Sequence, residues 1–313
     1  MPIIGTDVEA AAAKLRRGEL VAFATETVYG LGADAQSPPA MAKLYALKGR
    51  PANHPVIVHL PDFAQATRWA AAIPPAAENL AAAFMPGPLT LLLPATPHAV
   101  LTTGGGDTVA LRVPSHPLAQ RLLAAFGGGI AAPSANRFGR LSPTAAAHVV
   151  AEFAAADDLY VLEGGQSTVG LESAIVACLH GTVSILRPGV LSAEKITEVA
   201  GQSLLLPPSD LRAPGRLPRH YAPHTPLLLS AHCLQLPDKM IAAFSRHCPP
   251  GVAGNFWRCA PANAADYAHC LYATVRELDE LQADFLWVEL PPSSWHAVRD
   301  RLSRMAAARD EQI

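Results

Sequence analysis

The sequence predicts an α/β protein of two domains joined by a proline-rich linker. Strand-like and helix-like segments alternate over residues 1–206, prolines crowd residues 207–226, and a second alternating run fills residues 227–313. The length of 313 residues fits one large domain or two ordinary ones. Half of the composition is hydrophobic, mostly alanine, leucine and valine, which is ample for a packed core.

Capping residues and apolar runs define the elements of the first domain. Thr6-Asp7-Val8-Glu9 is a capping-box pattern that predicts a helix over 7–17, and Gly49 is a C-cap for a helix that begins near Pro38. The other predicted helices cover 63–71, 75–84, 117–126, 142–150 and 192–200. The predicted strands cover 20–24, 56–60, 89–93, 108–113, 130–132, 159–162, 173–177 and 183–186, and residues 25–32 read as a loop.

The second domain reads as three repeats of a strand followed by a helix. The predicted strands cover 227–229, 252–256 and 285–290, and the predicted helices cover 238–247, 264–281 and 295–308. This rhythm is typical of a small three-layer, Rossmann-like domain with a parallel sheet. The prolines of residues 207–226 favour an extended linker without regular structure.

Charge and cysteine content exclude several classes of protein. The net charge is −2, with 13 basic and 15 acidic residues up to residue 206 and 11 of each after it, so neither half is a basic nucleic-acid module. The five cysteines form no CxxC pair, which favours reduced thiols and a cytoplasmic protein. No signal peptide or membrane span is predicted.

Two short motifs favour an anion-binding pocket. Lys48-Gly49-Arg50-Pro51 places two cations on a tight loop, and Pro133-Ser134-Ala135-Asn136 places a hydroxyl and an amide on another. Each also has a structural interpretation: the cations can bind the last carbonyls of a helix, and a Ser-x-Asn turn can satisfy its own backbone. The loops at Thr27, His59, Ser134 and Ser173 all lie at or just past predicted strand ends, which favours one shared site.

Charged or titratable residues also interrupt apolar strands. Arg112 lies within Val109-Ala110-Leu111-Arg112-Val113 and needs either a buried partner or an anionic ligand. His59 is either a hydrogen-bonded core residue or a ligand contact, and Arg187 is a third candidate for phosphate charge. No P-loop, GxGxxG, GxSxG or HExxH motif is present, and no metal-ligand set is identified. The residues alone therefore predict an anion site but no reaction.

A set of ordered segments resembles the threonylcarbamoyl-AMP synthase family, which is built on the YrdC-like domain. The resemblance runs from about residue 10 to residue 229. Its segments are Ala24 to Gly32, Lys48-Gly49-Arg50-Pro51, Val58-His59-Leu60, Pro86 to Thr90, Thr108 to Pro114, Ala132 to Asn136, Gly170 to Ser173 and Leu186 to Gly189. Arg219-His220-Tyr221-Ala222-Pro223 and the C-terminal segments are similar to the longer, two-domain branch of the family.

The resemblance implies an open, twisted mixed sheet with flanking helices for residues 1–206 and a nucleotidyltransferase activity. Threonine and bicarbonate or CO2 would give N-carboxythreonine, whose carboxylate attacks the α-phosphate of ATP. Threonylcarbamoyl-AMP and pyrophosphate would form, with Mg2+ sharing the phosphate charge. A separate transferase would then pass the threonylcarbamoyl group to adenosine in tRNA. Direct tRNA binding is not indicated by the charge.

The resemblance also assigns site residues. It places threonine at Thr27, His59, Arg112, Ala132 and Ser173, and ATP at Arg50, His54, Thr108, Ser134, Asn136, Ser142, Arg187 and Tyr221. Lys48 and Arg50 are the expected catalytic cations, and no protein ligand for a metal is assigned. Position 54 is often asparagine in the family. Tyr221 makes the linker a candidate lid over the nucleotide.

Two other functions stay open from the sequence. A carbamoyltransferase, as in hydrogenase maturation, shares the same core, but the zinc-finger cysteines of those proteins are missing here. A non-catalytic module that binds structured RNA would need a basic face, which the near-neutral charge disfavours.

Overall fold

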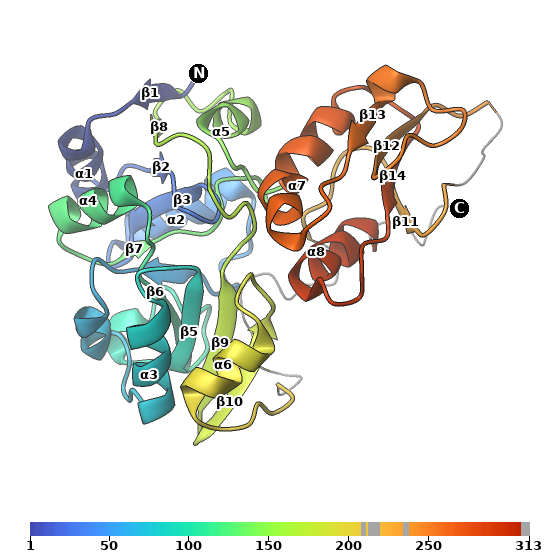
Figure 1. Ribbon diagram of the computed structural model, residues 1–313. Helices are drawn as coiled ribbons and strands as arrows, with labels where there is room; N and C mark the ends of the chain where they lie inside the picture. Colours follow the sequence, from blue (N-terminus) through green and yellow to red (C-terminus); the bar gives the residue numbers. More distant parts are fainter. Residues whose placement is uncertain (208–210, 212–219, 234–237, 308–313) are drawn as a thin grey trace.

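The computed structural model describes residues 1–207, 211, 220–233 and 238–307 of the chain. Figure 1 shows two lobes side by side, a larger one from the first two thirds of the chain and a smaller one from its C-terminal part. The described residues of the large lobe form a ten-stranded mixed sheet, and those of the small lobe form four strands with only parallel pairings. The predicted α/β class and the mixed first sheet are therefore confirmed.

The large sheet has the spatial order β1-β8-β2-β3-β7-β4-β6-β5-β9-β10. Its strands are β1 (Ile3–Gly5), β2 (Val21–Phe23), β3 (Gly30–Asp34), β4 (Ile57–His59), β5 (Leu89–Pro94), β6 (Thr108–Arg112), β7 (Ile130–Ala131), β8 (Tyr160–Leu162), β9 (Ala174–Leu179) and β10 (Thr182–Arg187). The helices are α1 (Val8–Arg16), α2 (Pro38–Lys48), α3 (Pro75–Phe84), α4 (Pro117–Phe126), α5 (Ala146–Glu152) and α6 (Ala193–Ala200), with 3-10 turns at Phe63–Arg68 and Pro97–Ala99.

Local capping chemistry explains why the helix ends were predictable. The Asp7 carboxylate accepts hydrogen bonds from the first free N–H groups of α1, and Gly49 ends α2 in the left-handed conformation at φ 61°. Two predicted helices differ from the structure. Residues 63–71 contain only a 3-10 turn, and α5 begins at Ala146 because the Ser142 hydroxyl bonds elsewhere and caps no helix.

Strands β1 and β3 were missed. Residues 30–34, predicted to start within a loop, pair with both β2 and β7. A side chain at Gly32 of β3 would be crowded, because its Cβ would lie 3.0 Å from the side chains of Phe23 and Ile130 and from the Val21 carbonyl oxygen. A strand with two glycines carries too few apolar side chains to be recognised from its pattern.

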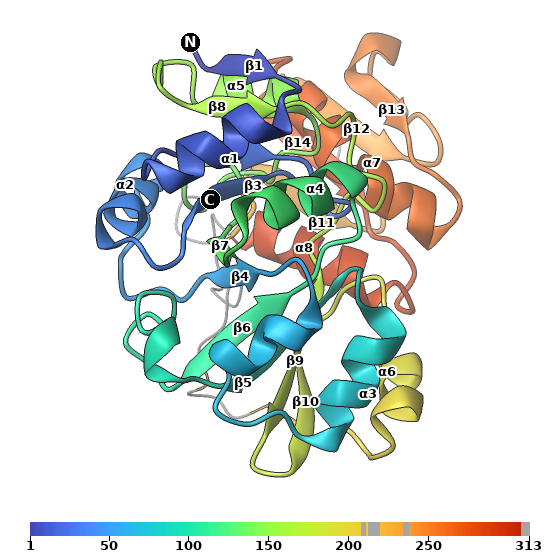
Figure 2. The ribbon, with the colours of Figure 1, turned by 90° about the vertical axis from the view of Figure 1, so that its left-hand side faces the viewer.

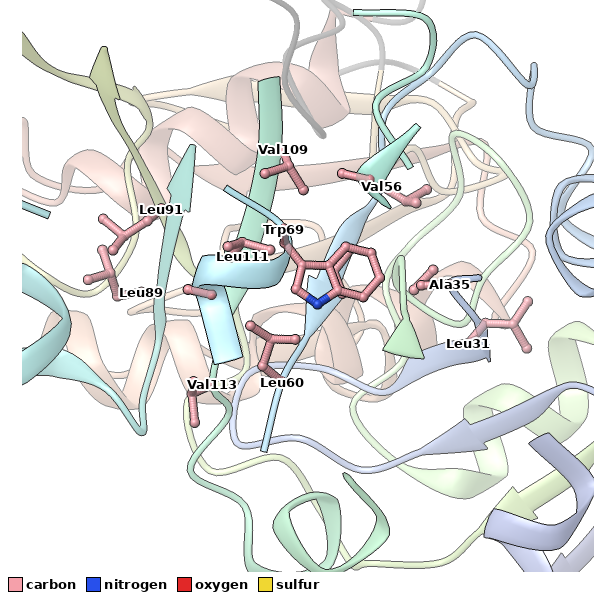
Figure 3. Close-up of a cluster of buried hydrophobic side chains, with 14 of the residues drawn as sticks. Leu31, Ala35, Val56, Leu60, Trp69, Leu89, Leu91, Val109, Leu111 and Val113 are labelled. Atoms are coloured by element: carbon pink, nitrogen blue, oxygen red, sulfur yellow. The ribbon is translucent and has the colours of Figure 1, made fainter. Parts of the chain in front are cut away.

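The two faces of the large sheet are covered differently. On one face, Trp69 packs among Val56, Leu60 and Leu111, as Figure 3 shows, in a core that extends to α2 and α3. On the other face, α1 and α4 lie side by side (Figure 2) over the part of the sheet that carries Val21 and Phe23. Beyond those helices, this second face is free to form a site.

The small lobe has the strand order β11-β14-β12-β13. Its elements are β11 (Leu227–Ser230), β12 (Ile241–Ser245), a 3-10 turn at Gly254–Phe256, β13 (Trp257–Cys259), α7 (Ala264–Asp279), β14 (Phe285–Glu289) and α8 (His296–Ala306). Both helices pack against the face that carries Ala242, Phe244, Leu286 and Val288, so the described part has two layers where three were predicted.

Two predictions in this lobe were wrong. Residues 238–247 were expected to be helical but contain β12, and the strand expected at 252–256 is a 3-10 turn followed by β13. A short apolar run fits a buried strand and a helix segment equally well, and here parallel pairing with β14 decides. None of the described helices has both the length and the apolar character needed to cross a bilayer.

Candidate active site

A cavity of about 50 Å³ lies against the face of β4 that carries Ile57 and His59. Eight of the predicted site residues line it: Thr27, Arg50, His59, Arg112, Ala132, Ser134, Arg187 and Tyr221. They come from segments between residue 27 and residue 221, so only the tertiary fold brings them together. The lining also includes Thr25, Glu172 and His220, which the sequence had not singled out.

Strand register explains how these side chains meet. His59 on β4 pairs in parallel register with Arg112 on β6, and both side chains project from the same face as Ile57. Thr27 follows β2, and Ser134 follows β7 and forms a bridge with Gly30. The site therefore combines strand ends with the open face of β4, whereas strand ends alone were expected.

Arg112 has the buried partner considered for it from the sequence, and it also lines the cavity. Its Nη2 donates to Glu26 Oε1 at 2.6 Å, its Nε donates to the Gly87 carbonyl at 3.3 Å, and it lines the cavity. Glu26 in turn accepts a hydrogen bond from the backbone N–H of Ser115 at 3.1 Å. The buried ion pair fixes the guanidinium, and three of its five N–H groups are left for a ligand.

Arg50 and Lys48 are neighbours with different orientations. Arg50 donates to the Pro55 carbonyl at 2.8 Å, lies 5.4 Å from the Phe138 ring and has a buried Nε with no partner. Burial lowers its pKa to about 10, so the group stays charged at neutral pH. Lys48 does not line the cavity: its ammonium donates to the carbonyls of Ser134, at 2.5 Å, and Asn136. Its contact is with the Ser134 loop.

Two histidines present unpaired ring nitrogens at the site. His59 and His220 are both buried, and the Nδ1 atom of each has no hydrogen-bond partner. Burial lowers the pKa of His220 to about 3, and burial together with nearby Arg112 lowers that of His59 well below its ordinary value. Both imidazoles are therefore neutral at physiological pH.

Glu172 is the one acidic residue among the described residues that line the cavity. It accepts hydrogen bonds from Ser142 Oγ at 2.5 Å, from Tyr272 OH at 2.9 Å and from Arg301 Nε at 2.7 Å. Burial alone would raise its pKa, but Arg301, Arg187 and the Ser142 hydroxyl together hold the pKa at about 2. The sequence signal was present, since Glu172 stands within the Gly170 to Ser173 segment.

Four predicted residues support the cavity without lining it. The Ser142 hydroxyl binds Glu172, the Ser173 hydroxyl bonds Thr90 Oγ1 at 2.7 Å, and the Asn136 amide donates to backbone carbonyls of its own loop. Lys48 is the fourth. Their direct ligand contacts stay predictions.

Two further predicted residues, Thr108 and His54, do not line the cavity. Thr108 begins β6, at the opposite end from Arg112, and borders a different hollow together with Asp107 and His180. The His54 ring packs edge-on against Phe138 at 5.3 Å. Neither residue lines the cavity, and their direct ATP contacts stay predictions.

The described residues offer no protein site for Mg2+. They contain no group of three histidine, cysteine, aspartate or glutamate side chains that could hold a metal ion. Glu172, which lines the cavity, is already bound to Arg301. A protein-held magnesium does not fit this arrangement.

Comparison with known proteins decides the family. Residues 13–189 match the family model described as "Telomere recombination", and residues 191–308 match the model described as "Threonylcarbamoyl-AMP synthase, C-terminal domain". The chain belongs to the threonylcarbamoyl-AMP synthase family. The presence of its C-terminal domain places the chain in the two-domain branch. The two matched regions meet near residue 190, earlier than the end at residue 206 predicted for the first domain.

Members of this family resemble the chain over most of its length. The threonylcarbamoyl-AMP synthase of Bacillus subtilis is 36% identical over 329 aligned positions, covering 96% of this chain and 92% of that protein. The Pyrococcus abyssi enzyme is 42% identical over 231, covering 71% of this chain and 67% of that protein. The crystal structure of P. abyssi Sua5 complexed with L-threonine superposes with a TM-score of 0.88 at 32% identity, covering 98% of this chain and 97% of that one.

A solved structure of full-length HypF shares the fold of part of this chain. That crystal structure matches 57% of this chain and 28% of its own at 19% identity, with a TM-score of 0.51.

Proposed function

We propose that this chain is an L-threonylcarbamoyladenylate synthase, which converts L-threonine, bicarbonate or CO2, and ATP into threonylcarbamoyl-AMP and pyrophosphate. One observation carries the proposal: Arg50, Arg112 and Arg187, from three distant segments, line one small cavity. Among the described residues, three guanidinium groups and a single carboxylate line this cavity, so its lining favours anionic ligands, and an amino-acid carboxylate and a triphosphate supply them. The product would serve the N6-threonylcarbamoyladenosine modification of tRNA.

Arg112 is the residue proposed to bind the threonine carboxylate. Its ion pair with Glu26 fixes the orientation of the planar guanidinium. The directions of its remaining N–H groups are therefore fixed as well. Thr27 and the backbone of Ala132 line the same cavity and are proposed to contact the rest of the amino acid. A preformed, buried guanidinium needs little reorganisation when the substrate binds.

Arg50 and Arg187 are the residues proposed to bind the phosphates. The carboxylate oxygen of N-carboxythreonine forms a bond to the α-phosphorus, and the bond from that phosphorus to the pyrophosphate oxygen breaks. Negative charge moves onto the leaving pyrophosphate, and fixed guanidinium groups neutralise it without an acid–base pair. Ser134 lines the same cavity as these cations.

Magnesium enters this proposal only as the companion of ATP. The phosphates and water would supply its ligands, because the described residues provide no set of them. No step here is derived from the ion.

Entry of the substrates requires the cavity to open. A volume of about 50 Å³ holds one or two water molecules and is far smaller than ATP. His220 and Tyr221 line the cavity from the linker, so their displacement would enlarge it. This supports the lid predicted for the linker, most of whose other residues lie outside the described part of the chain.

The first test is pyrophosphate release from ATP that depends on both threonine and bicarbonate. In the Arg112→Ala variant we expect KM for threonine to rise about tenfold or more, because a charge-assisted pair with the carboxylate is lost. KM for ATP should change much less. A wild-type protein that releases no threonine-dependent pyrophosphate, or an unchanged KM for threonine in the variant, would reject the assignment.

A further inference from the structure

The loop at residues 170–173 is held by both lobes. From the large lobe, Ser142 Oγ donates to Glu172; from the small lobe, Tyr272 OH and Arg301 Nε donate to the same carboxylate. Arg301 also donates from Nη2 to the Glu172 carbonyl at 3.4 Å, and its side chain is fully buried. A group from α8 therefore completes the surroundings of a residue that lines the cavity.

The same loop orients Arg187. Its Nε donates to the Ser173 carbonyl at 3.0 Å, and its Nη2 donates to Ser173 Oγ at 3.3 Å. Glu172 and Ser173 are consecutive, so a displacement of one displaces the other. Arg301 is therefore connected to the Arg187 guanidinium in the cavity wall through two consecutive residues, Glu172 and Ser173.

Tyr221, the linker residue that lines the cavity, packs against the same two small-lobe residues, Arg301 and Tyr272. The Arg301 guanidinium lies 5.4 Å from the centre of the Tyr221 ring, and the Tyr272 ring lies 5.8 Å from it. Tyr221 itself is buried and lines the cavity. Arg301 therefore contacts two separate parts of the cavity wall, the 170–173 loop and Tyr221.

We propose that Arg301 is a positioning residue for nucleotide binding, which holds Arg187 through Glu172 and Ser173 and holds Tyr221 through its ring. The small lobe is then part of the nucleotide site. This inference rests on the proposed function for the role of Arg187. A buried ion pair contributes little to stability compared with apolar packing, so docking of the lobes does not by itself require a charged pair here.

The Arg301→Met variant tests the proposal, because methionine keeps the apolar stem and removes the guanidinium. We expect Kd for ATP, measured by calorimetry without threonine, to rise about tenfold, and KM for ATP to rise with it. The matched control is Glu152→Gln, which weakens another contact between the lobes, the 3.5 Å pair of Arg276 and Glu152, away from the cavity. That control should bind ATP like the wild type.

Further variants keep the test decisive. Arg301→Lys retains the charge without the planar fork and should recover part of the ATP affinity. Glu172→Gln, which keeps the shape of the side chain, should weaken ATP binding as Arg301→Met does, and the double variant should be no weaker than either alone. Glu172→Gln also decides the matter if Arg301→Met does not fold.

Two results would overturn the inference. One is an equal effect of Arg301→Met and Glu152→Gln on ATP binding; the other is an ATP affinity of folded Arg301→Met that equals that of the wild type. If the proposed function is wrong, the wild-type protein will release no threonine-dependent pyrophosphate. That outcome differs from both results named above. The calorimetric comparison of ATP binding would still decide the role of Arg301.

Discussion

Lys48 shows how one buried charge can act on a site that it does not touch. Its ammonium is almost entirely buried and donates to the carbonyls of Ser134 and Asn136, so it fixes the loop from which the Ser134 side chain reaches the cavity. Burial lowers its pKa well below the ordinary value, and the nearby positive charge of Arg50 adds to this. The group is therefore sensitive to any change in its partners.

The Lys48→Met variant should lose stability and ATP affinity together. Two buried carbonyls lose their charged donor, which costs roughly 1–3 kcal/mol of the free energy of unfolding. Urea denaturation and KM for ATP measure the two effects. Lys43→Met is the matched control on the same helix, because Lys43 is exposed and its ammonium donates to the Gly18 carbonyl, away from the cavity. Unchanged stability with a lowered kcat would instead favour direct contact with phosphate.

Residue type and position were predictable from the sequence, but side-chain direction was not. Ser134 faces the cavity, whereas the amide of Asn136, two residues later, bonds the carbonyls of Arg137 and Arg140. Both belong to one motif, and nothing in its spacing separates their roles. The role of Glu172 could not be predicted for another reason. Its partners Tyr272 and Arg301 lie 100 and 129 residues away in the sequence.

At the scale of elements, a helix with a clear start signal could be predicted closely, while some of the short strands could not. Residues 75–84 were predicted as a helix and form one with the same ends, since proline at the start and an apolar stripe define it. β12 was taken for a helix, because its five residues are recognised only by pairing with β14 and β13. Such pairing is a long-range property that no local pattern contains.

Gly170 is the point where the 170–173 loop meets α7 most closely. Its φ is +80°, and a Cβ there would lie 2.4 Å from the carbonyl oxygen of His269 and 2.5 Å from that of Ala268. Backbone atoms cannot move aside cheaply, so a side chain must push the loop away from the small lobe. This glycine therefore sets the distance between the loop and the lobe that orients it.

The Gly170→Ala variant should be destabilised and should bind ATP more weakly. The matched control is Gly165→Ala, because Gly165 has a similar φ of +77° but no atom within 4 Å of the added methyl group. Both variants carry the conformational cost of about 1–2 kcal/mol, and only Gly170→Ala adds the collision. Thermal melting and ATP calorimetry measure the difference. Equal behaviour of the two variants would show that close contact with α7 is unimportant.

At the scale of the whole molecule, the near-neutral net charge of −2 conceals a concentration of buried charge at the site. Arg112 with Glu26, and Arg301 with Glu172, are ion pairs removed from water. Buried histidines surround them in neutral form. The pH dependence of folding should therefore be dominated by these buried groups and not by the exposed ion pairs, which are screened.

Acid should weaken the fold in two separable ranges. The buried and half-buried histidines have folded pKa values below the unfolded value of about 6.5, such as about 4 for the half-buried His148, where burial is the main cause and Arg276 adds to it. Below pH 6.5 the unfolded chain binds more protons than the folded one, so the free energy of unfolding falls as the pH drops toward 4. Glu172 has a folded pKa of about 2, and its contribution is lost only below pH 4.5.

The range from pH 6.5 to 5 therefore reports on histidines, and His148 allows a clean test outside the cavity. Its Nδ1 accepts a hydrogen bond from the Thr144 N–H at 3.2 Å, which the side-chain oxygen of asparagine can also accept. In His148→Asn, the loss of unfolding free energy between pH 7 and pH 5 should be about 1 kcal/mol smaller than in the wild type, after allowance for partial exposure. Urea denaturation at both pH values measures this, and between pH 7 and 8, where both states are neutral, the two proteins should show the same slope. An identical pH dependence from 7 to 5 would mean that His148 becomes protonated without unfolding, and that its burial does not hold it neutral.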